Sequence, residues 1–250
     1  MISSNSVLLC IKCSSALLIA ATGIALAGNE AELWTLSDRW KFSLSATPIF
    51  VGFLGATTSA AGQFFGQRLE KKKKHAEFVL AALAWDLHDI TGIDVRDLGT
   101  AAYIKHRWGR WVWPWQEGLR RLARVRPKLA GTSGVRWRPG VGVVGQAVSK
   151  RRDVCENLDL LDSQLTNATK PDWEQQDEDA RMGMSFDEYH GARGMFAVVL
   201  ASPMIHPNSS EVVGCLSVDA PAGSYAQLSG DPVRAAVGAA ADELAQRIFS

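Results

Sequence analysis

The sequence has few cysteines and histidines, and they are scattered along the chain. Its 250 residues contain four cysteines and five histidines. Cysteines this few and this far apart do not build a disulfide framework. Cys10 and Cys13 form a C-x-x-C pair, but no second pair completes a tetrahedral metal site, and both border an apolar segment. We therefore expect no disulfide scaffold and no metal centre, and the sequence identifies no cofactor.

Recognisable catalytic and nucleotide-binding arrangements are also missing. The histidines at 75, 88, 106, 190 and 206 show neither metal-ligand spacing nor a serine-histidine-aspartate order. Gly140, Gly142 and Gly145 do form a G-x-G-x-x-G sequence. A dinucleotide-binding loop should follow a buried apolar strand, whereas residues 135–139 (VRWRP) are neither apolar nor free of proline. We expect a protein that is not an enzyme.

Charge is absent from one long stretch, residues 42–66, and a run of lysines follows at 71–74. An uncharged segment of this length can cross a bilayer as a helix, and a basic run beyond it stays on the cytoplasmic side. Residues 7–28 form an earlier apolar segment, broken only by Lys12. The sequence therefore predicts a multi-pass protein of the cell membrane with three parts: a transmembrane hairpin within residues 1–66, a basic juxtamembrane helix linker at 67–75 and a cytosolic domain at 76–250.

The first apolar segment has a competing interpretation as a cleaved signal peptide. Residues 25–27 (ALA) resemble a small-residue cleavage site. Against this, Lys12 lies inside the apolar region instead of before it, and a second apolar segment follows directly. We favour a retained helix.

Basic and acidic residues are unevenly distributed along the rest of the chain. Residues 67–138 contain 16 basic and 7 acidic residues, and residues 139–250 contain 8 basic and 16 acidic residues. A basic region next to a membrane span would be attracted to the anionic inner leaflet. Tryptophans alternate with arginines in residues 106–115. This pattern suits a membrane interface, a hairpin connection whose tryptophans cap a core, or a stacking platform for bases. Nucleic acid is not the expected partner. The residues expected at the membrane interface are Lys71, Lys72, Lys73, Lys74, Trp108 and Trp111.

The cytosolic part shows the pattern of a mixed helix and strand domain. An amphipathic helix is predicted from His75 to Thr91, and it continues the second span through the lysines. Residues 155–190 are acidic and irregular, which predicts a long loop covering a pocket. The other predicted elements are strands within 95–105 and 118–128, a short helix ending near Lys150, a strand hairpin at 195–205 and 211–220, and a helix that begins at Asp231.

This order of elements resembles a GAF domain over about residues 76–249. Three segments carry the resemblance: 137–148 (WRPGVGVVGQAV), 152–154 (RDV) and 211–221 (EVVGCLSVDAP). The resemblance implies an α+β fold with a central antiparallel sheet, the first and last helices on one face and a small-molecule pocket on the other. It also implies pairing of protomers through the helices, so we expect a homo-oligomer.

Two functional signatures known from such domains do not match this sequence. Only Phe186-Asp187-Glu188 echoes the signature of cyclic-nucleotide GAF domains, and its spacing differs. Free-methionine-sulfoxide reductases are similar in the glycine segment but have cysteine where Val144 stands. A thiol-based redox enzyme using Cys155 and Cys215 is the weakest alternative.

The resulting hypothesis is a membrane-anchored sensory protein whose cytosolic domain binds a small ligand and signals through its membrane helices or a partner. Arg193 is expected to pair with an anionic ligand. Two spans rich in small residues also resemble two-helix membrane effectors of nucleotide-signalled bacterial defence, and this alternative stays open. The expected ligand-binding residues are Phe186, Tyr189, Arg193 and Phe196.

Overall fold

A computed structural model describes residues 18–27, 29–31, 35, 37–108, 116–126, 134–165 and 169–249. The chain divides into two units, Met1–Glu70 and Lys71–Ser250. Helix α2 (Asp38–Thr91) begins in the first unit and ends in the second. The prediction that one helix runs from the uncharged stretch through the lysine run to Thr91 is therefore confirmed.

No helix among the described residues has both the length and the apolar character needed to cross a membrane. The predicted span at residues 7–28 falls partly on residues 7–17 and 28, which lie outside the described residues. The predicted span at 42–66 belongs to α2, but many of its side chains also lie outside the described ones. The transmembrane hairpin gains no support from the structure and stays a prediction.

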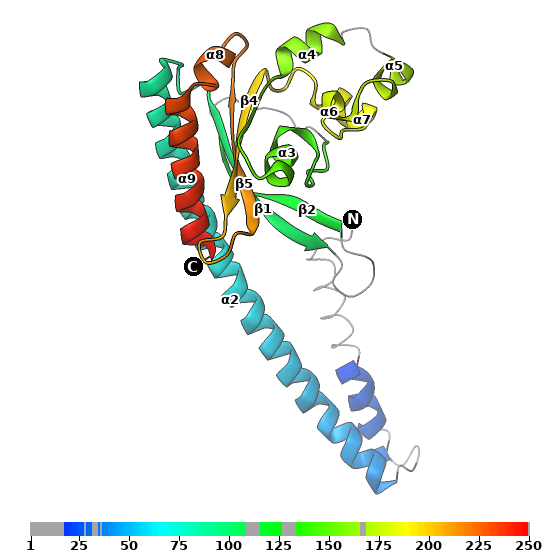
Figure 1. Ribbon diagram of the computed structural model, residues 1–250. Coiled ribbons are helices and arrows are strands. Elements are labelled where there is room, and N and C mark those ends of the chain that lie inside the picture. Colours follow the sequence, from blue (N-terminus) through cyan, green and yellow to red (C-terminus); the bar gives the residue numbers. More distant parts are fainter. Residues whose placement is uncertain are drawn as a thin grey trace. The chain divides into compact units, whose positions relative to one another are not determined.

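The second unit contains a five-stranded antiparallel sheet, which confirms the predicted α+β class (Figure 1). The strands lie in the order β2-β1-β5-β4-β3. Every residue of β5 is buried, because this central strand is covered on both faces. The strands are β1 (Gly99–Trp108), β2 (Gln116–Val125), β3 (Val154–Asn157), β4 (Val198–Ile205) and β5 (Val212–Ala220).

One face of the sheet packs against the end of α2 and against α9 (Asp231–Phe249) (Figure 1). Leu80, Leu83 and Leu87 of α2 are fully or almost fully buried, at the spacing of one helix face. The buried Thr100 hydroxyl of β1 donates a hydrogen bond of 3.1 Å to the Leu80 carbonyl. Both helices lie where the GAF resemblance implies them.

The other face carries α3 (Gly142–Lys150) and the segment 158–196, which we call the cover. The prediction of an irregular loop at 155–190 was wrong. Its described residues form β3 and four short helices, two of which begin at capping boxes at Thr169 and Ser185. Helices this short show no apolar period in the sequence. The short helices are α4 (Leu158–Gln164), α5 (Lys170–Glu174), α6 (Glu178–Arg181) and α7 (Phe186–Ala192), and α8 (Tyr225–Leu228) precedes α9.

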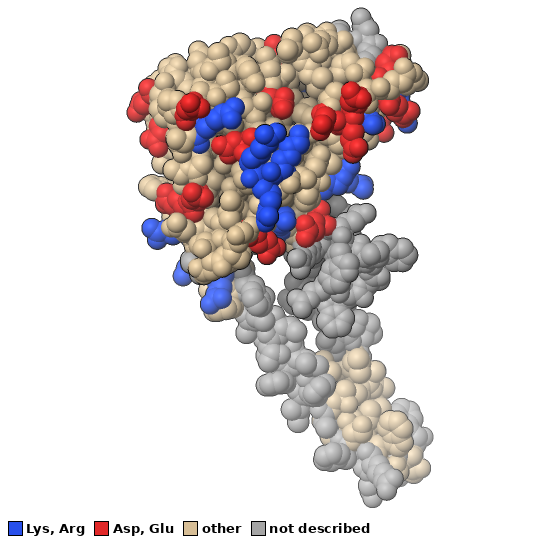
Figure 2. All heavy atoms as spheres, in the orientation of Figure 1, with Lys and Arg blue, Asp and Glu red and all other residues tan. Residues whose placement is uncertain are grey.

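The fold mixes the basic and acidic regions of the sequence. Strand β1, from the basic region, pairs with β5, from the acidic region. Figure 2 shows a cluster of basic side chains in the middle of the visible face, with acidic side chains on several sides of it. The charge asymmetry along the chain is therefore not a simple division of this face into two halves.

Two glycine substitutions test the packing of the second unit. A Cβ atom at Gly145 would lie 2.2 Å from the backbone oxygen of Arg138, and this backbone atom cannot turn away as a side chain can. We expect Gly145→Ala to lower the free energy of unfolding by about 2–3 kcal/mol. Gly238→Ala in α9 is the control, because its Cβ meets nothing within 4 Å. It should raise stability by about 0.5–1 kcal/mol. Urea unfolding of the wild type and both variants measures these changes in the free energy of unfolding. The same change in both variants would contradict the described packing.

Candidate ligand pocket

A cavity of about 70 Å³ lies between the sheet and the cover. Its floor comes from β1, β2, β4 and β5, and its other walls come from α3, α4, α7 and the turns around them. A single buried water needs roughly 10–15 Å³ on this measure. The space therefore holds several waters or one ligand of a few non-hydrogen atoms.

Small side chains on the sheet create this space. Ala101 of β1 pairs with Ser217 of β5 on one side and with Arg124 of β2 on the other, and Ser217 pairs with Ala201 of β4. Residues paired directly across antiparallel strands point to the same face. The floor therefore contains two small residues, Ala101 and Ser217, next to Arg124, while Ala201 continues this row without lining the cavity.

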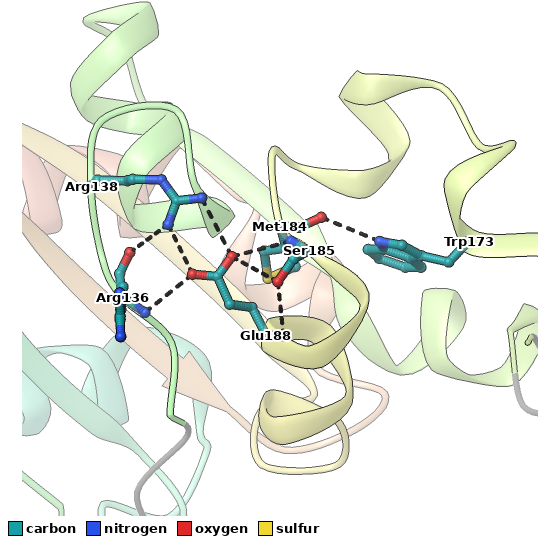
Figure 3. Close-up of polar contacts among 6 residues, drawn as sticks. All are labelled: Arg136, Arg138, Trp173, Met184, Ser185 and Glu188. Carbon is teal, nitrogen blue, oxygen red and sulfur yellow. Dashed lines mark hydrogen bonds and ion pairs between the residues drawn. The ribbon is translucent and has the colours of Figure 1, made fainter. Parts of the chain in front are cut away.

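The cover has a small aromatic core of its own. Trp173 is 1% exposed and stacks on Tyr189 with ring centroids 4.2 Å apart. Its indole nitrogen donates a hydrogen bond of 3.2 Å to the Met184 carbonyl (Figure 3). Trp173 is not among the residues predicted for the pocket, although a lone tryptophan in a polar run is a signal for a buried residue. This core holds the cover in one position over the pocket.

The glycine segment docks the cover instead of holding a phosphate. Its amides are already used: Gly140 donates to the Gly145 carbonyl, Gly142 to the Met182 carbonyl and Gly145 to the Val141 carbonyl. Gly183 approaches so closely that a Cβ on it would lie 2.5 Å from the Gly140 oxygen. These bonds agree with the expectation that the segment is not a dinucleotide-binding loop.

Glu188 joins the cover to the strand-like segment that precedes α3 (Figure 3). Its carboxylate accepts hydrogen bonds from Arg138 Nη1 at 2.8 Å, from the Arg136 amide at 3.4 Å and from the Ser185 amide at 3.1 Å. Burial alone would raise the pKa of Glu188, but the bonds from Arg138 and Ser185 outweigh burial and lower it. The ionised carboxylate is therefore the form that the fold favours.

A second carboxylate, that of the buried Asp219, lies at the end of the pocket floor. Its Oδ2 is 3.2 Å from Nη2 of Arg126, which also donates to the Met195 carbonyl. Burial raises the pKa of Asp219, while Arg126 and Arg124 act in the opposite direction. Burial likewise raises the pKa of Tyr103 on the floor, so its hydroxyl is neutral and able to donate at neutral pH.

The structure brings three of the four predicted ligand-binding residues together. Tyr189, Arg193 and Phe196 line the pocket, whereas Phe186 packs beside it with its ring 5.8 Å from that of His190. Burial first, and then Asp162, raises the pKa of Tyr189 to about 12. Arg193 donates a hydrogen bond of 3.3 Å to the Asp162 carbonyl. Whether these residues bind a ligand stays a prediction.

The residues predicted for a membrane interface are placed only in part. The four lysines at 71–74 are exposed on α2, where Lys73 lies 3.8 Å from Glu77. Trp108 ends β1, but its side chain is outside the described residues, as is all of Trp111. No finding tests their contact with lipid.

The two described cysteines are held as neutral thiols. Cys155 is half-buried, and burial raises its pKa to about 11. Cys215 is fully buried, and burial raises the pKa of its thiol even further. Within the described part of the chain, no cluster of histidine, cysteine and acidic residues could hold a metal ion.

Removing the charge of Glu188 tests the link between cover and sheet. Glu188→Gln should lower the free energy of unfolding by about 1–2 kcal/mol at pH 7, because it weakens charge-assisted hydrogen bonds but keeps the shape. The pKa of Glu188 is lower in the folded chain than in the unfolded one. The stability that its ionised carboxylate contributes is therefore complete above the ordinary pKa of about 4.3. This contribution is lost as the pH falls through the lowered pKa of the folded chain.

The difference between wild type and Glu188→Gln should therefore shrink as pH falls from 5 toward 3 (about the range of such a carboxylate), measured by urea unfolding. Glu174→Gln is the matched control, because Glu174 is exposed and lies 4.0 Å from Lys170 in a helical pair. A difference that stays constant with pH would contradict the assigned role.

Comparisons with known proteins give likenesses of fold at low identity. No protein-family model matches this chain, and no curated protein does so either. A type II free methionine-R-sulfoxide reductase from Thermoplasma acidophilum is 16% identical, with a TM-score of 0.42 over 71% of this chain and 94% of that one. The GAF domain region of a protein from Geobacter sulfurreducens is 19% identical, with a TM-score of 0.44 over 74% and 97% of the two chains. A GAF domain from A. aeolicus in an inactive state is 11% identical, with a TM-score of 0.37 over 71% and 96%.

Proposed function

We propose that this chain is a sensory protein of the GAF type, in which the second unit binds a small ligand between the sheet and the cover. The observation that carries the proposal is the pocket itself. Apolar walls meet a few convergent polar groups there, and this combination is typical of small-molecule sites. The GAF resemblance of the sequence and the layered sheet support the same assignment.

A binding role is favoured over thiol chemistry by the state of the cysteines. The nucleophile in such chemistry is the thiolate, which forms readily only where the pKa is lowered. Burial raises the pKa of both Cys155 and Cys215. Val144, at the position where the similar reductases have cysteine, is a wall of the pocket.

One hydrogen bond gives ligand binding a route to α2. Ala101 lines the pocket, and its neighbour Thr100 points to the opposite face and donates to the Leu80 carbonyl of α2. A change in β1 on ligand binding would act on α2 through this bond and through the buried leucines around it. We propose that α2 transmits the signal.

Ligand binding is tested by thermal unfolding of the full-length chain with a library of small metabolites. A ligand that binds the folded state raises the unfolding temperature. Compounds that stabilise the wild type should lose this effect in Ala192→Phe, where the new ring enters the pocket from its wall. Ala235→Phe, exposed on α9 on the other side of the sheet, is the control and should respond as the wild type does. If the compounds stabilise Ala192→Phe as much as the wild type, the pocket is not the site where they bind. If no compound stabilises the wild type, the pocket is not supported as a ligand site.

We propose further that the first unit anchors the protein to the cell membrane, with the second unit in the cytoplasm. The support is in the sequence: residues 42–66 carry no charge, and the exposed lysines 71–74 follow on the same helix. Exposed lysines next to a bilayer interact favourably with anionic lipid headgroups.

Fractionation of cells tests the membrane anchor. The full-length chain should sediment with membranes and stay there after washing with high salt and alkaline carbonate, because these remove proteins held by charge alone. A variant that lacks residues 1–66 should be released into the supernatant. Finding the full-length chain itself in the supernatant would contradict the anchor but would leave the ligand pocket untouched.

A further inference from the structure

A β-bulge turns two arginines of β2 to the pocket side of the sheet. Residues three apart on a regular strand point to opposite faces. Ala102 pairs with Ala123 and Tyr103 with Arg121, so Leu122 is an extra residue without a pairing partner in β1. Leu122 and Ala123 both enter the core on the helix side, and Arg121 and Arg124 therefore share the other face.

Both arginines line the pocket without a carboxylate partner. Neither Arg121 nor Arg124 forms an ion pair with any residue that the structure describes. Arg124 is half-buried, and its Nη2 is enclosed without a hydrogen-bond acceptor among those residues. An enclosed donor left unpaired costs on the order of 1–3 kcal/mol, and an acceptor supplied by a ligand would remove that cost.

The described acids near the pocket form their short contacts with other groups, although Asp219 also attracts Arg124 through space. Asp219 is paired with Arg126 at 3.2 Å. Asp162 accepts a hydrogen bond of 3.0 Å from the Gly194 amide at the far side of the pocket. The β2 side of the pocket therefore has three arginines, Arg121, Arg124 and Arg126, near the single carboxylate of Asp219, and it keeps an excess of positive charge.

Most of the other side chains that line the pocket are apolar. Apolar side chains from α3 and from the cover surround the space next to the two arginines. They are Val143, Val144, Met182, Met184 and Phe196. An inorganic anion would leave these side chains without a contact, whereas a short hydrocarbon group would bury apolar area against them. The volume of about 70 Å³ limits this group to a few carbon atoms.

We infer that the pocket is specific for a small organic acid, whose carboxylate is bound by Arg124 and, at the more exposed rim, by Arg121. This inference rests on the proposed function and names the ligand class for the same site. Arginine suits this role because its planar guanidinium matches the two oxygens of a carboxylate. The predicted residue Arg193 also lines the pocket, where it donates to the Asp162 carbonyl.

The test is isothermal titration calorimetry of the full-length chain, purified in a mild detergent, with three probes: propionate, its neutral analogue propionamide, and inorganic phosphate. Propionate should bind more tightly than both of the others. Arg124→Gln should weaken propionate binding about tenfold or more, because one charge-assisted contact is lost. Arg121→Gln should weaken it less, since Arg121 is exposed to solvent. Arg120→Gln, on the neighbouring exposed position outside the pocket, should leave binding unchanged.

The outcomes separate this inference from the proposed function. Propionamide binding as tightly as propionate, or propionate binding that neither arginine variant weakens, would overturn the assignment of an anion site while a ligand pocket still stood. Phosphate binding more tightly than propionate, with loss in Arg124→Gln, would overturn the organic-acid class. If neither these probes nor the metabolite library stabilised the chain, both the inference and the proposed function would fail. Far-ultraviolet circular dichroism of each variant shows whether a loss of binding comes from a loss of fold.

Discussion

The sheet of the second unit has to be covered on both faces, and the two faces meet this constraint differently. Strands β4 and β5 are almost entirely buried, so neither face can be left to solvent. Large aliphatic side chains of α2 and α9 fill one side completely. On the other side, α3 packs on β4 and β5, and the small side chains of Ala101 and Ser217 leave a space beside it under the cover. This space is the pocket.

The cover can only enclose this space because it is fixed at its own edges. Trp173 and Tyr189 give it a core, Glu188 ties it to Arg138, and the turn at Gly183 rests on the backbone of Gly140. The glycines that look like a phosphate loop in the sequence allow close approach of two backbone segments. Rigid support around a mainly apolar pocket with a few polar groups is the arrangement that a selective binding site needs.

Long regular elements could be predicted from the sequence, because their apolar periods are long enough to identify. This holds for the end of α2, for the hairpin of β4 and β5 and for α9. Strand β3 and the short helices of the cover could not be predicted, since capping and tertiary contacts decide them. Tyr189, Arg193 and Phe196 were placed at a pocket from their position in the cover. Arg121 and Arg124 were not, because the bulge at Leu122 that turns both to one face leaves no signature in the sequence.

The proposed role of the pocket requires that the anionic group of a ligand binds between the sheet and the cover, next to Arg124. A crystal structure of the full-length chain grown with propionate tests it most directly. The account predicts one propionate in the pocket, with its carboxylate within hydrogen-bonding distance of Arg124 and its methyl group against Val143 or Val144. A pocket closed by its own side chains, or propionate bound only elsewhere on the chain, would contradict it.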